Sequence, residues 1–207
     1  MAAEPRTDKA RATRDRIVRA ATQLVSRKGY FHTTVDDVLA ATRLTKGGFY
    51  AHFDSKEDLG RAVIDHANQV FEGRVIAHVH RFHDPRDQLH ALLEAYRLYA
   101  IGKAFDGGCF FVNLAAEMDD QHEEFAGLVA DRFAGFRTLV RDIVEAGKAN
   151  GTFRADAPSD GLAAAIVGYL NGTILQAKVG RAFDLFDAGN QVMHGLVDRW
   201  AVPKAQG

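Results

Sequence analysis

The sequence predicts an all-α protein in which a small N-terminal three-helix domain, residues 1–55, is joined to a larger helical domain, residues 56–207. Apolar residues recur at three- and four-residue intervals along most of the chain, and no segment shows the two-residue alternation of a β-strand. Hydrophobic residues make up 47% and charged residues 26%, as in ordinary globular proteins. The length of 207 residues suits one large domain or two smaller ones.

The first two predicted helices lie within residues 1–42. Apolar residues between Ile17 and Val25 form one stripe at helical spacing, and Gly29 follows as a C-terminal cap. Either Thr33 or Thr34 is placed to cap a short second helix over the stretch VDDVLAA, because a threonine hydroxyl can accept a hydrogen bond from the first turn. A tight turn, TRL, then follows.

Two more helices are expected after this turn. Thr45 is a suitable cap for a third helix that runs to about Phe53. Ser55, with acidic residues directly after it, should open a long fourth helix. Pro85 should mark the end of that helix or a kink near it, because proline removes a backbone donor.

The rest of the larger domain is predicted to consist of longer helices. Glycines at 107–108 and the turn-forming stretch 149–160 separate its apolar stripes. The expected helices cover residues 87–103, a short buried segment within 109–118, a long segment through 125–143, and the ranges 159–179 and 184–200.

Charge and cysteine content limit the function classes. The formal net charge is −1, but residues 1–28 hold eight Lys and Arg against three Asp and Glu. A basic end suggests a local contact with a polyanion, although a solvated helix face explains the same charges. One cysteine excludes an internal disulfide framework and suits a reducing cytoplasm. We identify no secretory signal and only short apolar runs, so we expect a cytoplasmic protein without membrane contact.

The stretch TKGGFY, residues 45–50, gives the strongest indication of function. A short helix, a tight turn and a second short helix form a helix-turn-helix, whose second helix enters the DNA major groove. Gly47 and Gly48 each cost about 1 kcal/mol relative to alanine in a helix, so we expect them to permit close approach to DNA. Lys46 can reach a phosphate or a guanine edge, and Tyr50 can donate its hydroxyl to a phosphate.

Neighbouring residues should support this contact. Thr45 at the helix start leaves N–H groups that can face a phosphate. Lys56 also begins a helix, and its charge lies near the positive end of that helix. Phe49 and Phe53 are four residues apart, so they share a helix face that should pack into the core of the small domain.

Residues 13–60 resemble the DNA-binding domain of the TetR family of transcriptional regulators. The resemblance runs through an apolar first helix, the stretch GYFHTT, and T-K-G-G-F-Y-x-H-F-x-S-K-E-x-L in order. It implies a homodimeric regulator, more often a repressor, whose larger domain binds an effector and thereby releases a double-stranded DNA operator. Twofold symmetry would make that operator palindromic. By this resemblance the residues expected to meet DNA are Thr33, Thr34, Thr45, Lys46, Tyr50, His52 and Lys56.

Arg43 departs from the family pattern, in which the turn between the two helices usually holds a glycine. A non-glycine residue in the left-handed conformation costs on the order of 1 kcal/mol. Either the turn differs slightly in shape, or Arg43 adds a contact to DNA. Both interpretations remain open at this point, and Arg43 is kept among the candidate DNA contacts.

The last two predicted helices offer a dimer interface. Small residues four apart form a groove that allows close approach of another helix, and larger apolar residues lie beside it. Packing within one subunit explains the same stripes, but TetR proteins pair these helices into a four-helix bundle, which favours the dimer. The candidate interface residues are Ala164, Gly168, Tyr169, Gly172, Leu196 and Trp200.

The middle helices are expected to hold the effector site. Ligand pockets are mostly apolar with a few placed polar groups, although aromatic stripes are more often plain core. The aromatic content suggests a small apolar or aromatic effector. The candidate lining residues are Tyr96, Tyr99, Phe105, Cys109, Phe110, Asn113 and Glu117.

Cys109 raises a second possibility for the signal. If Asp106 caps the short helix, the thiol falls in its first turn, where a helix N-terminus favours the reactive thiolate. The segment G-C-x-x-x-N, from Gly108 to Asn113, resembles that of some TetR-family sensors of electrophiles or oxidants. An inert buried cysteine is the alternative.

Other functional classes have less support. The sequence lacks a phosphate-binding loop and the G-x-S-x-G and H-E-x-x-H motifs, so we expect no enzyme. No cofactor is implied. The histidines of HVHRFHD, residues 78–84, lack the ligands that complete a metal site, so we expect none. A DNA-binding protein without small-molecule input remains an alternative.

Overall fold

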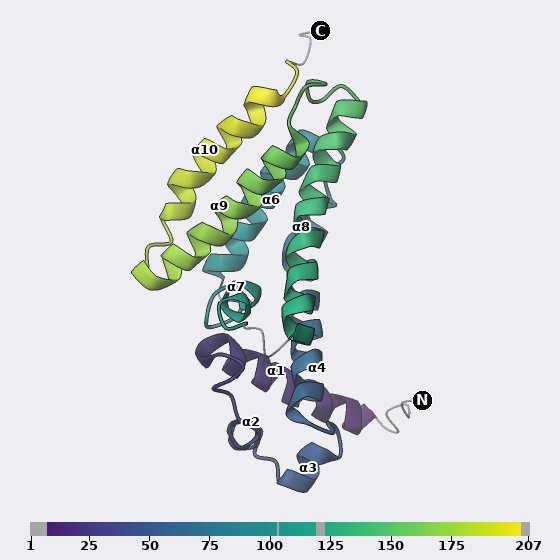
Figure 1. Ribbon diagram of the computed structural model, residues 1–207, viewed down its shortest axis with the longest axis vertical. Helices are drawn as coiled ribbons and strands as arrows, with labels where there is room; N and C mark the ends of the chain where they lie inside the picture. Colours follow the sequence, from purple (N-terminus) through teal and green to yellow (C-terminus); the bar gives the residue numbers. More distant parts are fainter. Residues whose placement is uncertain (1–7, 103, 119–122, 204–207) are drawn as a thin grey trace.

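The computed structural model describes residues 8–102, 104–118 and 123–203, and its regular structure is helical (Figure 1). Within these residues the one extended pairing is an isolated bridge between Phe153 and Ala201, so the all-α prediction is confirmed. In chain order the elements are α1 (Asp8–Lys28), α2 (Val35–Thr42), α3 (Lys46–Tyr50), α4 (Lys56–Phe71), the π-helical turn η1 (Glu72–Ile76), α5 (Ala77–Val79), α6 (Pro85–Ile101), α7 (Phe110–Ala115), α8 (Glu123–Ala149), α9 (Ser159–Gly180) and α10 (Leu185–Trp200).

The molecule is elongated, with α1, α2 and α3 at one end and α9 and α10 toward the other (Figure 1). We call residues 8–55 the head and residues 56–203 the body. The head is built around aromatic rings: Phe49 and Phe53 are 0% and 1% exposed, and their ring centroids lie 5.7 Å apart. The guanidinium of Arg14 lies 4.7 Å from the Phe53 ring centroid. The prediction that both phenylalanines pack into the core of the small domain is confirmed.

α4 connects the head to the body. Ser55 caps it, as the sequence predicts, because the serine hydroxyl accepts a hydrogen bond of 3.1 Å from the Asp58 N–H. The helix packs along α1 and then continues through η1 and α5. Pro85 does not end it. Pro85 begins α6 instead, capped by Asp84, since proline at the first helical position loses no helical hydrogen bond. The boundary between residues 55 and 56 falls at the start of α4 and stays a prediction.

α6, α8, α9 and α10 form the body. α8 packs along α9, and α6 lies against both α8 and α10. The core at the centre of these helices is aromatic: the ring of Phe71 makes edge-to-face contacts with Tyr96, Tyr99 and Phe136 at centroid distances of 5.3 to 6.1 Å. The short helix α7 contacts both α8 and α1, so it lies where the body meets the head.

α9 differs from the expectation of short apolar runs, because by length and composition it is apolar enough to cross a membrane. In the folded chain it packs against α8, α10 and α6. Its buried side chains, among them Ile166 and Leu170 at 0% exposure, belong to the core of the body. One side of this helix is therefore buried in the core of the body, while the other side is exposed.

Candidate nucleic-acid interface

The predicted helix-turn-helix is present, and side-chain caps define its helices. Thr34, rather than Thr33, caps α2: its hydroxyl accepts from the Asp37 N–H at 3.2 Å, and the Asp37 carboxylate accepts from the Thr34 N–H at 2.7 Å. This reciprocal capping box satisfies two donors that would otherwise lack partners. Thr45 caps α3 as predicted, because its hydroxyl accepts from the Gly48 N–H at 3.2 Å.

The backbone of Arg43, in the turn between α2 and α3, has the left-handed conformation, with φ 55° and ψ 38°. Its backbone N–H bonds to the Leu39 carbonyl, as does the N–H of Leu44. The turn therefore has the conformation that favours glycine, with an arginine in its place, and it holds strain on the order of 1 kcal/mol. The Arg43 side chain is exposed. A change in the turn conformation is excluded as the explanation for this residue, whereas its contact with DNA stays a prediction.

α3 presents an unobstructed first turn. The Lys46 side chain is 72% exposed, with its ammonium 3.7 Å from the Asp36 carboxylate, and Tyr50 is 54% exposed. A Cβ added to Gly47 would meet no atom within 4 Å, whereas one at Gly48 would lie 3.4 Å from the Thr45 hydroxyl oxygen. Packing within the described chain therefore does not require glycine at position 47.

Two predicted DNA contacts are directed into the protein. Thr33 is 3% exposed, and its hydroxyl donates to the Gly29 carbonyl at 2.6 Å, so its side chain does not reach the surface. The Lys56 ammonium lies 4.6 Å from the Tyr30 ring centroid and 3.4 Å from the Phe31 carbonyl oxygen. Burial lowers the pKa of this lysine. Tertiary packing that the sequence pattern does not show produces these inward contacts, and the contacts of Thr33 and Lys56 with DNA stay predictions.

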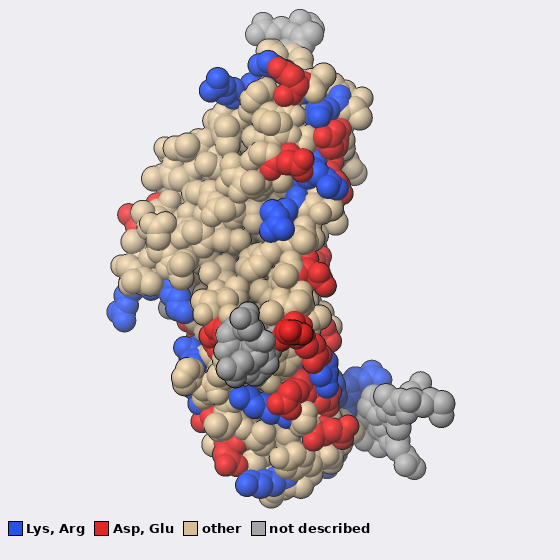
Figure 2. All heavy atoms as spheres, in the orientation of Figure 1, with Lys and Arg blue, Asp and Glu red and all other residues tan. Residues whose placement is uncertain are grey.

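The remaining predicted contacts lie at the surface of the head. Thr34 is exposed and His52 is half-buried just beyond α3. Lys28, at the end of α1, forms an ion pair of 2.6 Å with Asp37, and this contact holds the pKa of that carboxyl well below its usual range. Figure 2 shows Lys and Arg interspersed with Asp and Glu over the head. This surface is therefore not a uniform polycation.

The body carries a broad uncharged face over α9 and α10 (Figure 2). The predicted groove is open there: a Cβ at Gly168 or Gly172 would meet no atom within 4 Å. Large apolar side chains are exposed on the same two helices, including Leu175 at 48%, Val179 at 81% and Val192 at 66%. Of the other predicted interface residues, Ala164 is exposed and Tyr169, Leu196 and Trp200 are half-buried.

Tyr169 also has a role within one subunit. Its hydroxyl donates to the Asn190 side-chain oxygen at 2.8 Å, and its ring fills the space beside Gly189, where a Cβ would be 2.4 Å away. Trp200 similarly lies beneath the guanidinium of Arg154, at 5.0 Å from the ring centroid. These two residues join α10 to the rest of the body.

Five of the predicted effector residues cluster in the body. Tyr96, Tyr99, Phe105, Cys109 and Phe110 are each no more than 4% exposed. A cavity lined in part by Tyr96 and Cys109 has a volume of about 10 Å³, which is room for about one water. The predicted cluster therefore exists, and in this conformation it is closely packed.

The other two predicted effector residues, Asn113 and Glu117, contact the head, and their role in effector binding stays a prediction. The Glu117 carboxylate accepts from the Tyr30 N–H at 2.8 Å and from the Phe31 N–H at 3.4 Å. Asn113 donates to the carbonyls of Ser26 in α1 and of Gly107 before α7, at 3.3 and 2.7 Å, and it accepts from the Lys178 ammonium of α9 at 2.9 Å. The sequence pattern does not reveal these contacts, because the partners are far away along the chain.

The surroundings of Cys109 differ from the expectation. Cys109 itself occupies the cap position of α7, after Gly108 with φ 91°, and is 4% exposed. Asp106 does not cap that helix; its backbone N–H bonds to Gln23 and its carboxylate lies 3.8 Å from Arg27. The thiol is therefore buried beside the aromatic cluster rather than set within an exposed first turn.

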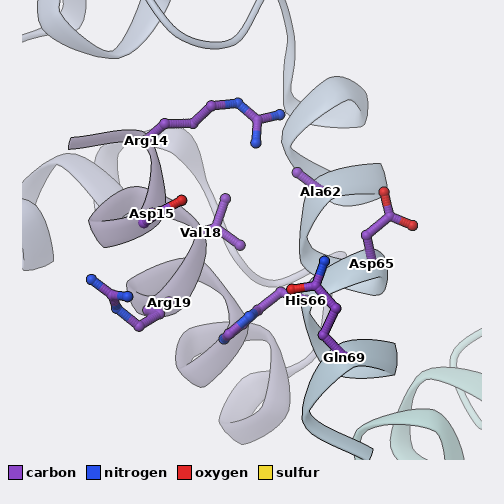
Figure 3. A pocket seen from close by; sticks show the side chains of 8 residues that line it. All are labelled: Arg14, Asp15, Val18, Arg19, Ala62, Asp65, His66 and Gln69. Atoms are coloured by element: carbon purple, nitrogen blue, oxygen red, sulfur yellow. The ribbon is translucent and has the colours of Figure 1, made fainter. Parts of the chain in front are cut away.

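A hollow that the sequence did not predict lies between α1 and α4, with a volume of about 340 Å³ (Figure 3). Charged and polar side chains from both helices line it, including Arg14, Arg19 and Asp65. Burial and the nearby Arg19 charge lower the pKa of His66, which lines the same hollow. Both signs of charge are present, so the hollow does not select an anion or a cation.

Comparisons with known proteins agree with this architecture. The family model described as "Bacterial regulatory proteins, tetR family" matches residues 17–63, and the model described as "Tetracyclin repressor-like, C-terminal domain" matches residues 85–191. The transcriptional regulator AcuR of Cereibacter sphaeroides is 30% identical over 167 residues, covering 79% of this chain and 75% of that protein. The repressor DhaR of a Mycobacterium species is 27% identical, covering 81% of this chain and 83% of that protein.

Solved structures show the same fold. A TetR transcriptional regulator from Chloroflexus aurantiacus superposes with a TM-score of 0.89 at 29% identity, covering 94% of this chain and 98% of that one. The regulator CifR, solved with 26-base-pair operator DNA, superposes with a TM-score of 0.79 at 21% identity, covering 90% and 95% of the two chains. From the helix-turn-helix, the helical body and these matches, the chain belongs to the TetR family of transcriptional regulators.

Proposed function

We propose that this protein is a dimeric cytoplasmic repressor that binds a palindromic operator through α3 and leaves it when a small effector occupies the body. The observation that carries the proposal is the first turn of α3. Position 47 holds glycine although the described chain leaves room for a larger residue there. The exposed side chains of Lys46 and Tyr50 lie on the same short helix. A helix of this kind can lie directly against base edges and phosphates.

Roles for the exposed head residues follow from their chemistry. Lys46 reads a guanine edge or a phosphate, Tyr50 donates to a phosphate, and Thr34, Arg43 and His52 contact the backbone on either side. The exposed ion pair of Lys46 with Asp36 is weak and can be exchanged for DNA at little cost. Substituting Lys46→Ala should cost about 1–3 kcal/mol of binding and relax specificity at one base pair if the lysine reads a guanine.

Dimerisation through α9 and α10 is supported by their uncharged outer face. Side chains such as Leu175 and Val179 expose apolar surface to water unless a partner subunit covers them. The open space beside Gly168 lets a helix of that partner approach closely. A Leu175→Asp variant should sediment as a monomer and lose cooperative operator binding. Retention of the parental dimer by this variant would place the interface elsewhere.

The segment 104–117 connects the predicted effector site to the head, so it can transmit effector binding and cause release of the operator DNA. Its residues contact the end of α1: the Gly107 N–H donates to the Ser26 hydroxyl at 2.9 Å, and Glu117 binds the N–H groups that follow α1. The same segment holds Cys109 and Phe110 of the closely packed cluster. A ligand that expands the cluster would therefore displace residues that orient α1 and, with it, α3.

The experiment that tests the proposal is a footprint of the purified protein on DNA from directly upstream of its own gene. We expect a protected palindrome with half-sites one or more helical turns apart. Lys46→Ala should lose that protection while its circular dichroism spectrum stays unchanged. If the variant protects the palindrome as the parent does, α3 is not the recognition helix.

A second candidate replaces ligand binding with thiol chemistry at Cys109. The observation that favours it is that the thiol of Cys109 lines the same small cavity as the cationic side chain of Arg132. Oxidation of a lone cysteine can give a sulfenic acid, a mixed disulfide or a bridge between subunits. Cys109→Ser separates the candidates: a ligand sensor still releases operator DNA in response to its effector, whereas a thiol sensor does not respond to oxidants.

A further inference from the structure

We propose that the effector is a small carboxylic acid with an apolar body, and that Arg132 of α8 binds its carboxylate. This proposal rests on the function proposed above, in which an effector releases the operator DNA, and it names the chemistry of that effector. It starts from an unusual cation in the closely packed cluster, which neither the helix-turn-helix nor the dimer face uses.

Arg132 points its charge into aromatic rings. The guanidinium carbon lies 4.2 Å from the ring centroid of Phe71, 5.6 Å from that of Phe111 and 5.8 Å from that of Phe136. Its Nε atom is buried and has no hydrogen-bond partner among the described residues. Other arginines of the body, such as Arg97 and Arg141, form ion pairs with carboxylates, whereas none of the described carboxylates lies within 4 Å of Arg132.

An unpaired cation in this position is unfavourable for the empty protein. Burial lowers the pKa of Arg132, and the exposed Glu72 opposes this only from a distance. Contacts with the ring faces recover part of the lost hydration, because the faces are electron-rich. They leave the buried Nε–H without a hydrogen-bond partner, and a planar guanidinium presents its donors in a fork that matches a carboxylate.

Other polar side chains lie near Arg132 and supply hydrogen-bond donors of the kind that a carboxylate needs. The Tyr99 hydroxyl is buried without a hydrogen-bond partner among the described residues, and burial, together with the neighbouring Cys109, raises its pKa well above the ordinary value. Asn171 lines the same cavity and accepts from the Tyr96 hydroxyl at 3.2 Å. Tyr99 does not line the cavity, so Tyr96 and Asn171 are the polar side chains that an entering carboxylate would meet beside Arg132.

The rest of the cavity determines the body of the ligand. Its other walls are the rings of Phe71, Phe111, Phe133 and Phe136. These rings favour an aliphatic or aromatic group over a sugar or a nucleotide. Arg132 and Phe133 are themselves half-buried and form the outer wall. Because the cavity now holds about 10 Å³, an acid enters only when these side chains and the adjoining α7 move apart.

The test measures binding of phenylacetate and benzoate, and of their neutral amides, to the full-length dimer by calorimetry and thermal shift. We expect each acid that binds to be favoured over its amide by about tenfold or more, because only the acid pairs with the guanidinium. Arg132→Gln should abolish this preference, and Arg132→Lys should retain part of it. Arg137→Gln is the matched control, since Arg137 is exposed on the same helix.

Equal affinity for acids and amides, an unchanged preference in Arg132→Gln, or no binding of either acid at millimolar concentration would overturn the proposal. A ligand-free measurement adds an independent check: Arg132→Gln should melt no lower than the parent, because it removes an unpaired charge. Loss of folding in this variant would show that Arg132 is structural and would also overturn the proposal. None of these measurements uses DNA, so a missing operator footprint would contradict the proposed function alone.

Discussion

Substituting Gly47→Ala should make the protein more stable and a poorer DNA binder. The added methyl would meet no atom within 4 Å in the free protein, so it removes only the backbone entropy that glycine loses in a helix. Alanine is favoured over glycine by about 1 kcal/mol in a helix interior, which sets an upper limit in the first turn of α3. For a chain of this length that gain corresponds to a rise in Tm of about 2–4 °C.

On the operator, the same methyl would lie between α3 and the DNA. Overpacking a close contact typically costs about 1–3 kcal/mol, so we expect operator affinity to fall by a factor of about 5 to 150. The assays are thermal unfolding by circular dichroism and fluorescence anisotropy with the footprinted fragment. Gly127→Ala is the control, because its Cβ would also meet nothing within 4 Å and the residue is exposed in α8, far from α3 along the chain.

The control should gain similar stability and bind DNA as the parent does. If Gly47→Ala is stabilised and also binds the operator with parental affinity, the first turn of α3 does not approach DNA closely. That result would refute the claim that Gly47 permits close approach of α3 to DNA, whatever the effect of Lys46 substitutions.

Three further predictions concern the head. Arg43→Gly should relieve the left-handed strain and stabilise the protein by up to about 1 kcal/mol in urea unfolding, and if Arg43 contacts a phosphate it should also reduce the salt slope of operator binding by about one. Glu117→Ala should lower the free energy of unfolding by about 1.5–3 kcal/mol in the same assay, because the backbone N–H of Tyr30 loses its charged acceptor. An unchanged urea midpoint would contradict this contact. Asp37 has a folded-state pKa lowered by Lys28, so its stabilising contribution is present above the unfolded carboxyl pKa of about 4 and is lost as pH falls toward the lowered value. Asp37→Asn should therefore lose stability near neutral pH and show a flatter acid limb in thermal melts between pH 5 and pH 2, whereas parallel curves would show that the ion pair does not contribute.

The sequence predicts the helices of the head well, because their signals are local. Thr45, Ser55 and Gly29 each lie at the end of an apolar stripe, and a cap acts on residues three or four positions away. Long-range contacts were not predictable in this way. Lys56 turns toward the ring of Tyr30, and the pattern of the fourth helix contains nothing that specifies this ring.

The candidate site in the body shows the same limit. The aromatic cluster follows from the composition of the middle helices, and the structure brings Tyr96, Tyr99 and Phe110 together. Arg132 carries no local signal, because an arginine in a long amphipathic helix is ordinarily solvated. Its unusual position depends on rings from three different helices, α4, α7 and α8, and becomes visible only in three dimensions.

The close approach of Gly107 to α1 affects how this regulator can be re-engineered. A Cβ at Gly107 would lie 1.6 Å from the Ser26 carbonyl oxygen, and a Cβ at Gly29 would lie 2.4 Å from a Glu117 carboxylate oxygen. The surfaces on the two sides of the junction are thus fitted to each other residue by residue. Consider a chimaera in which the first 55 residues come from another regulator and the body from this protein. Its two parts would meet through surfaces that do not match. To transmit its signal, the graft must carry the segment 104–117 along with the first 55 residues.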